Sequence, residues 1–294
     1  MRIKFSDGYQ VNPLPRWGHG LALHPQILSA LEKSRADYAR VLEELETHRA
    51  ALHAVSHDYN PRDPTAPFWN NVWFSTLDAA SLVGFLLSRK PTRYLEIGSG
   101  HSTMFARYAV RSGGLRTAIT SVDPRPRAQI DALCDRVVRA PLETCDLAVF
   151  EELEPNDLLF LDGSHRIFTN SDVTVFFLEV LPRLKPGVLV HVHDVFLPAD
   201  YPPAWNTRGY SEQYLLGAML LCGAPPIRVI LPNYYVCTDS WLGSRVRDIF
   251  RAGHGGRDIP IAYANAGKTP GVSFWLETVR PLRAPDLMPE WGED

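Results

Sequence analysis

The sequence predicts an α/β protein: a seven-stranded, mostly parallel sheet with helices on both faces, preceded by an N-terminal helical extension. From about residue 93 onward, short apolar runs alternate with helical patterns, an order typical of parallel sheets covered on both sides. Most of these runs are continuously apolar, as strands buried on both faces are. The first run ends in a tight glycine turn that leads directly into a helical pattern, which is the opening unit of a nucleotide-type site in such a sheet.

The elements follow in a regular order. The predicted strands are Tyr94–Ile97, Ala118–Val122, Arg136–Arg139, Leu158–Leu161, Val188–His193, Ile227–Leu231 and Val272–Thr278. The predicted helices of this part are 76–89, 102–111, 126–133, 144–151, 170–184, 212–222 and 242–250. The gap from 234 to 271 is otherwise long and irregular, as functional loops often are.

The N-terminal region is a separate unit in this prediction. Residues 1–25 form an irregular arm, and Pro25 opens a helical pattern that continues to about Val55 without Gly or Pro. We therefore expect one helix of roughly 30 residues with a narrow apolar face, which lies on the surface or pairs with a second copy in a homo-oligomer. A turn-rich linker divides the chain into residues 1–60 and a catalytic domain of residues 61–294.

Composition excludes several partners. The chain is 45% hydrophobic and 21% charged, with a net charge of −3, which is ordinary for a soluble globular protein. This charge predicts no binding to nucleic acid, and no apolar run approaches the ~20 residues of a membrane span. The four cysteines have no C-x-x-C spacing, so we expect reduced thiols and a cytoplasmic location.

The glycine turn carries the evidence on the cofactor. In the stretch RYLEIGSGHST, Glu96 precedes Gly98-Ser99-Gly100, and Thr103 stands where a dinucleotide-binding turn has its third glycine. A carboxylate here would repel a pyrophosphate and attract a ligand with an ammonium and a sulfonium. S-adenosylmethionine is that ligand. Asp123 ends the second strand, where an acidic residue can accept hydrogen bonds from two ribose hydroxyls.

With these motifs the chain resembles class I S-adenosylmethionine-dependent methyltransferases, which have a Rossmann-like sheet, over roughly residues 70–285. The EIGSGHST and LDGSH segments and the later HD-x-F segment resemble more narrowly the bacterial branch that contains macrolide-sugar O-methyltransferases. The resemblance implies that Glu96, Gly98 and Gly100 hold the methionyl part, with Ser99 beside them and Asp123 on the ribose. Ser102 and Thr103 either cap the next helix or touch the donor's carboxylate. Adenine is expected near residues 140–142.

The chemistry is expected at the ends of the fourth and fifth strands. Asp162 and Asp194 end adjacent strands, so their carboxylates can converge on one cation such as Mg²⁺, and Asp162 also faces the donor. Position matching to the macrolide-sugar branch implies Asp162, His193 and Asp194 as metal ligands. His193 stands where that branch has a carboxylate, and imidazole suits Mn²⁺ or a softer ion better. His165 matches the branch's general base.

Simpler readings remain open at each position. An acidic strand end also orients substrate without a metal, and one of His191 and His193, which share a strand face, can be packed in the core. Two segments can wall an acceptor pocket: the aromatic run 68–74, and the loop and helix start of 195–214. The candidates in the second segment are Tyr201, Trp205, Arg208, Glu212 and Gln213.

The sequence thus predicts O-methylation of a hydroxyl on a sugar or natural-product small molecule, assisted by a divalent metal such as Mg²⁺ or Mn²⁺. Two alternatives remain: a hydroxylase-like relative that uses the His-Asp cluster for iron, and a catalytically silent module that binds S-adenosylmethionine and assembles through its long helix.

Overall fold

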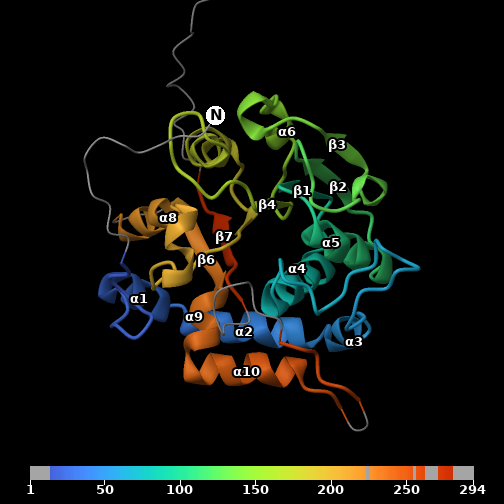
Figure 1. Cartoon of the computed structure of the whole chain (residues 1–294), viewed down its shortest axis with the longest axis horizontal. Coiled ribbons are helices and arrows are strands. Elements are labelled where there is room, and N and C mark those ends of the chain that lie inside the picture. The colour runs from blue at the N-terminus through green and yellow to red at the C-terminus, as the bar shows by residue number, and fades with distance from the viewer. Residues whose placement is uncertain (1–13, 223–225, 254–255, 262–270, 281–294) are drawn as a thin grey trace, which may run out of the picture.

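The computed structural model describes residues 14–222, 226–253, 256–261 and 271–280. Its centre is a seven-stranded sheet in the order β3-β2-β1-β4-β5-β7-β6 (Figure 1). Every neighbouring pair is parallel except those that β7 makes with β5 and β6. The predicted mostly parallel sheet is therefore confirmed. The strands are β1 Arg93–Ile97, β2 Ala118–Val122, β3 Arg136–Val138, β4 Leu158–Leu161, β5 Leu189–Val192, β6 Ile227–Pro232 and β7 Phe274–Thr278.

Helices surround the sheet. The α-helices are α1 Pro25–Glu32, α2 Arg35–Glu46, α3 Arg49–His53, α4 Thr76–Arg89, α5 His101–Ser112, α6 Ala148–Glu151, α7 Asp172–Val175, α8 Glu212–Leu221, α9 Asn233–Thr238 and α10 Ser240–Phe250. The α4 and α5 helices pack side by side, α2 packs on α4, and α10 packs on α2 as an outer layer (Figure 1). Helix α4 contacts α5, α2 and Trp275 of β7, and its residues 76–87 are all buried.

The prediction of one helix from residue 26 to 55 is wrong, because the segment is broken into α1, α2 and α3. At each break the chain closes a tighter turn: the Ser34 N–H donates to the Leu31 carbonyl, and the His48 N–H donates to the Leu45 carbonyl. The three pieces have different sets of partners: α1 packs on α8, α2 on α4 and α10, and α3 on α10. A straight rod could not follow these partners around the domain, so tertiary packing overrides the continuous helical pattern.

The apolar stripe of these helices packs into the core of the same chain. Its members are at most 4% exposed and belong to the main hydrophobic core: Ile27, Leu31, Tyr38, Leu42, Leu45 and Leu52. The stripe that suggested a second copy is therefore already covered, and a homo-oligomer formed through this region remains a prediction.

The helix predicted over 126–133 is also wrong. Only a single 3-10 turn, Asp131–Leu133, forms there. Pro124 and Pro126 flank the start of this segment, and each restricts the residue before it to extended conformations. Over 144–151 the helix begins only at Ala148, after a 3-10 turn at Leu142–Thr144.

Two further segments differ in detail from the prediction. The predicted helix 170–184 is helical but irregular: α7 continues as a π-turn at Phe176–Val180 and a 3-10 turn at Leu181–Arg183. In the gap predicted to be irregular, α9 precedes the expected helix near 242–250, which is α10, whereas 254–255 and 262–270 lie outside the described residues. No helix in the described ranges is long and apolar enough to cross a membrane.

The contact between α4 and α2 yields a stability prediction. A Cβ placed on Gly84 would lie 2.1 Å from Leu45 Cδ2, and Leu45 is itself fully packed. Gly84→Val should therefore overpack this contact and lower the free energy of unfolding by about 1–3 kcal/mol, as measured by urea denaturation. Gly253→Ala is the matched control, because no atom lies within 4 Å of a Cβ at that position. Equal stability of the two variants would contradict the close packing of α2 on α4.

Candidate functional site

The glycine turn is shaped by the close approach of β1 and β4. Gly98 has a φ of +82°, and a Cβ on it would lie 1.9 Å from the carbonyl oxygen of Asp162. The Asp162 N–H in turn donates to the Ile97 carbonyl at 2.8 Å, so the two strand ends remain hydrogen-bonded at this point. Only glycine fits both the backbone conformation and the available space.

Glu96 lies behind the turn and is fully buried. Its carboxylate accepts hydrogen bonds from the Tyr94 hydroxyl at 2.9 Å, from Ser102 Oγ at 3.0 Å and from Thr103 Oγ1. Thr103 Oγ1 also accepts from the Gly100 N–H, which caps the start of α5. Burial raises the pKa of Glu96 to about 7, although these hydroxyl donors act in the opposite direction. Glu96 and Thr103 therefore fix the shape of the turn.

In front of the turn lies a cavity of about 360 Å³, within the size range of small-molecule sites. The predicted donor-binding residues that line it are Gly98, Ser99, Gly100, Ser102, Asp123 and Asp162, whereas Glu96 and Thr103 do not. Asp123 accepts hydrogen bonds from the N–H groups of Ser99 at 2.8 Å and Arg125 at 2.7 Å. Adenine was expected near residues 140–142, and residues 141–143 form part of the wall.

Sequence reasoning missed several residues of this cavity. Arg127 is one, and its guanidinium lies 4.8 Å from the ring of Trp73, which lines the cavity with Phe74. Both aromatics belong to the run 68–74 that the sequence offered as a wall of the acceptor pocket. Asp172 also lines the cavity and accepts from the N–H of Ser164 at 2.6 Å, which holds the loop that follows Asp162. Neither Arg127 nor Asp172 is part of a motif, so no sequence signal could have identified them.

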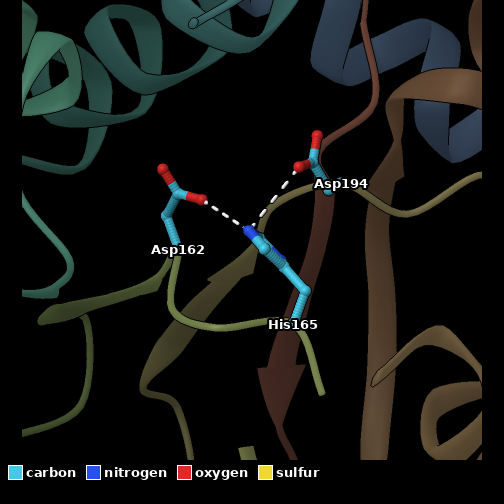
Figure 2. Close-up of side chains that lie close together, drawn as sticks. All are labelled: Asp162, His165 and Asp194. Carbon is cyan, nitrogen blue, oxygen red and sulfur yellow. Dashed lines mark ion pairs between the residues drawn. The ribbon is translucent and has the colours of Figure 1, made fainter. Parts of the chain in front are cut away.

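The structure brings Asp162, His165 and Asp194 together, as Figure 2 shows, and Asp162 is the member of this group that lines the cavity. His165 Nε2 lies 3.1 Å from Asp162 Oδ1 and 3.6 Å from Asp194 Oδ2. One ligand atom from each of the three residues lies within 4.8 Å of the others, so the group could hold a metal ion. His165 and Asp194 have positive φ angles of 62° and 57°, a strained conformation that clusters at functional sites.

His165 is held from behind by Glu212. Its Nδ1 lies 2.7 Å from Glu212 Oε1, and both side chains are nearly inaccessible to solvent. On one face the His165 ring stacks on Tyr210, with ring centroids 4.2 Å apart. Glu212 was considered only as a pocket wall or a first-turn residue of its helix, and its pairing with His165 depends on tertiary structure that the sequence does not reveal.

The other candidates for the acceptor wall are mostly buried. Tyr201 and Trp205 pack with Phe196 in an aromatic cluster, and Gln213 Oε1 accepts from the Phe196 N–H at 2.9 Å. Arg208 lies on this cluster, with its guanidinium 3.9 Å from the centroid of the Trp205 ring. These residues therefore support the loop beside His165.

The two histidines around β5 have different surroundings. His191 stacks on Trp275 at 3.9 Å and pairs with Ser273 at 2.5 Å, which is the packed core role left open from the sequence. His193 lies just past the strand, with Nδ1 3.5 Å from Asp162 Oδ1 and 3.5 Å from Asp194 Oδ1. Its Nε2 lies 3.4 Å from Asp78 of α4, a residue that sequence reasoning did not consider.

Burial and mutual charge set the protonation of this group. Burial opposes the charged form of each histidine, but Glu212 and Asp162 raise the pKa of His165 well above its ordinary value, and Asp194 and Asp162 do the same for His193. Burial would raise the pKa of Asp162, yet the charges of His193 and His165 hold it well below its usual range. Burial raises the pKa of Asp194, and the same histidines offset this only in part. The cluster is thus an acidic, largely buried site suited to a cation.

Comparison with known families identifies the domain. Residues 95–195 match the family model described as Methyltransferase domain. This segment is a methyltransferase domain. The match spans the glycine turn and all three residues of the Asp162 cluster, and the resemblance to class I S-adenosylmethionine-dependent methyltransferases is confirmed. The enzyme class predicted from the sequence is confirmed with it. A search of curated proteins found no match.

Several solved structures are similar to the methyltransferase at low identity. Rv0187 from MTB is 16% identical over 87% of this chain and 97% of that one, with a TM-score of 0.40. An O-methyltransferase from Bacillus cereus, in complex with SAH, is 18% identical over 82% and 91%, with a TM-score of 0.37. MycE of the mycinamycin biosynthetic pathway, in complex with Mg, SAH and mycinamycin VI, is 17% identical over 68% and 48%, with a TM-score of 0.33. No conclusion about this chain rests on these likenesses.

The buried Glu96 yields a prediction on pH dependence. Its pKa of about 7 in the folded chain exceeds its ordinary value of 4.5, so between these values the folded state binds a proton that the unfolded state has lost. This group's contribution to stability should therefore fall as the pH rises from 4.5 to 7, by about 3 kcal/mol in total. Glu96→Gln should remove this part of the pH profile, measured by urea unfolding at pH 5 and pH 8.

Exposed Glu179→Gln is the control for that comparison, and its profile should follow the wild type. If the Glu96→Gln profile ran parallel to the wild type as well, Glu96 would not be the buried titrating group described here.

Proposed function

We propose that this chain transfers the methyl group of S-adenosylmethionine to a hydroxyl on a sugar or natural-product acceptor, with a divalent metal held beside the donor cavity. The observation that carries this proposal is the position of Asp162. Its carboxylate lines the donor cavity and also belongs to the Asp162–His165–Asp194 cluster. A hydroxyl bound at the cluster would therefore lie next to the methyl donor.

The residues present fit a cation. Asp162, Asp194 and His193 are the proposed ligands, and the buried His193 has no hydrogen-bond partner at either ring nitrogen in the structure. A divalent metal bound here lowers the pKa of a coordinated hydroxyl. Two oxygen ligands and one nitrogen ligand are compatible with Mg²⁺ or Mn²⁺.

His165 is the proposed general base. Glu212 accepts the Nδ1 proton of His165, so Nε2 is left facing the site and can take the proton of the acceptor hydroxyl. The hydroxyl oxygen then forms a bond to the methyl carbon while the carbon–sulfur bond breaks, which leaves S-adenosylhomocysteine. The high resting pKa of His165 reflects the unscreened carboxylates around it, and a bound cation would oppose that shift.

The donor assignment is tested by calorimetry with S-adenosylhomocysteine and with NAD⁺. The chain should bind S-adenosylhomocysteine in preference to NAD⁺. Gly98→Ala should weaken that binding by at least ~10-fold, because its Cβ collides with the Asp162 carbonyl. Gly253→Ala should leave it unchanged. Preferential binding of NAD⁺ would rule out the proposed function.

The metal and base are tested by turnover on a panel of hydroxylated acceptors. Asp162→Asn and treatment with EDTA should each abolish methyl transfer, and Mn²⁺ or Mg²⁺ should restore it only after EDTA. His165→Gln should lower kcat by about 10²–10⁴-fold while S-adenosylhomocysteine binding is retained. Full turnover after both EDTA and Asp162→Asn would leave a metal-free mechanism, and donor binding without turnover on any acceptor would favour the silent module.

A further inference from the structure

His193 is a buried histidine that lies among three carboxylates without a hydrogen bond to any of them. It is 2% exposed, and neither of its ring nitrogens has a hydrogen-bond partner. His165 differs, since its Nδ1 pairs with Glu212 and its Nε2 lies 3.1 Å from Asp162. A buried polar atom without a partner requires an explanation, and the binding of an ion is one such explanation.

The ring of His193 points at the carboxylate pair. Nδ1 lies 3.5 Å from Asp162 Oδ1 and 3.5 Å from Asp194 Oδ1, while Nε2 lies 3.4 Å from Asp78 Oδ2. The two Nδ1 distances are long for hydrogen bonds but suit ligands that share a metal. Ligands about 2.1 Å from a tetrahedral ion lie about 3.4 Å apart, whereas neighbouring ligands of octahedral Mg²⁺ lie about 3.0 Å apart.

The ring is also fixed in place. Phe74 and Phe160 pack around it, with ring centroids 5.4 Å and 6.2 Å away. Asp78 is completely buried and is itself held by the side-chain amide of Asn233 at 2.8 Å and the N–H of Ser273 at 2.7 Å. With a metal on Nδ1, the Nε2 proton of His193 would face this fixed carboxylate at 3.4 Å.

We propose that His193 Nδ1 is a metal ligand, oriented by Asp78, and that it makes the site select a first-row transition-metal ion such as Mn²⁺, Fe²⁺, Co²⁺ or Zn²⁺ over Mg²⁺. Imidazole nitrogen suits these ions, whereas Mg²⁺ prefers oxygen ligands and keeps its waters. Asp78 is then a positioning residue of the kind that orients metal-binding histidines through the second ring nitrogen. This inference rests on the metal site of the proposed function and adds its selectivity.

The test uses the full chain and metal binding alone, with no acceptor. Competition dialysis with elemental analysis should show that the stripped wild type takes Mn²⁺ or Co²⁺ at least ~10-fold more tightly than Mg²⁺. Pulsed EPR of the Mn²⁺-loaded wild type should detect one directly coordinated nitrogen. Neither measurement needs a variant, so both remain informative if substitutions at His193 prevent folding.

Variants then show which residue supplies the nitrogen that is coordinated to the metal. His193→Gln should remove the nitrogen signal and the preference for Mn²⁺, and His193→Asp should restore Mg²⁺ binding through a third carboxylate. Asp78→Asn should weaken Mn²⁺ binding by about 10–100-fold. His191→Gln, at the buried histidine on the same strand, should leave both metal readouts unchanged.

Two outcomes would overturn the inference. One is equal affinity for Mn²⁺ and Mg²⁺ with no coordinated nitrogen, and the other is a nitrogen signal lost in His165→Gln but kept in His193→Gln. Failure here is distinguishable from failure of the proposed function. A site that binds Mg²⁺ through carboxylates and still supports methyl transfer would contradict only the selectivity, whereas a selective metal site without methyl transfer would contradict only the reaction.

Discussion

The parallel hydrogen-bond ladder through β1, β4 and β5 is the constraint on which the site depends. The ladder continues past the ends of the regular strands: the Asp162 N–H donates to the Ile97 carbonyl, and the His193 N–H donates to the Leu161 carbonyl at 3.0 Å. These two bonds bring the residues after each strand to the same edge of the sheet. The glycine turn, the Asp162 loop and the His193–Asp194 segment therefore lie next to one another, although the last two are about 30 residues apart in the chain.

Three fully buried carboxylates each hold one part of this edge. Glu96 ties the glycine turn to the start of α5, Glu212 of α8 holds His165, and Asp78 of α4 faces His193. Each would be costly to bury alone, and each has donors or a histidine that compensate for the lost hydration. The helices that cover the sheet thus also supply the groups that orient the site.

The N-terminal segment takes part in the same architecture. Asp200 lies in the loop that follows Asp194, and its carboxylate accepts hydrogen bonds from the N–H groups of Arg16 and Trp17. The His24 N–H donates to the carbonyl of Pro198 in that loop at 3.0 Å. The arm that precedes α1 therefore secures the loop beside this edge of the sheet, and α1 to α3 continue the packing around α8, α4 and α10.

The sequence by itself determined the strand succession, the glycine turn and the convergence of Asp162, His165 and Asp194. These follow from local patterns, because apolar runs, glycines and polar strand ends are encoded within a few residues. Only the tertiary structure decided that Glu96 lies behind the turn, that the N-terminal helix is broken, and that Asp78 and Glu212 stand behind the two histidines. The pairs His165–Glu212 and His193–Asp78 are 47 and 115 residues apart in the chain. No local sequence pattern indicates which helix face will meet which strand end.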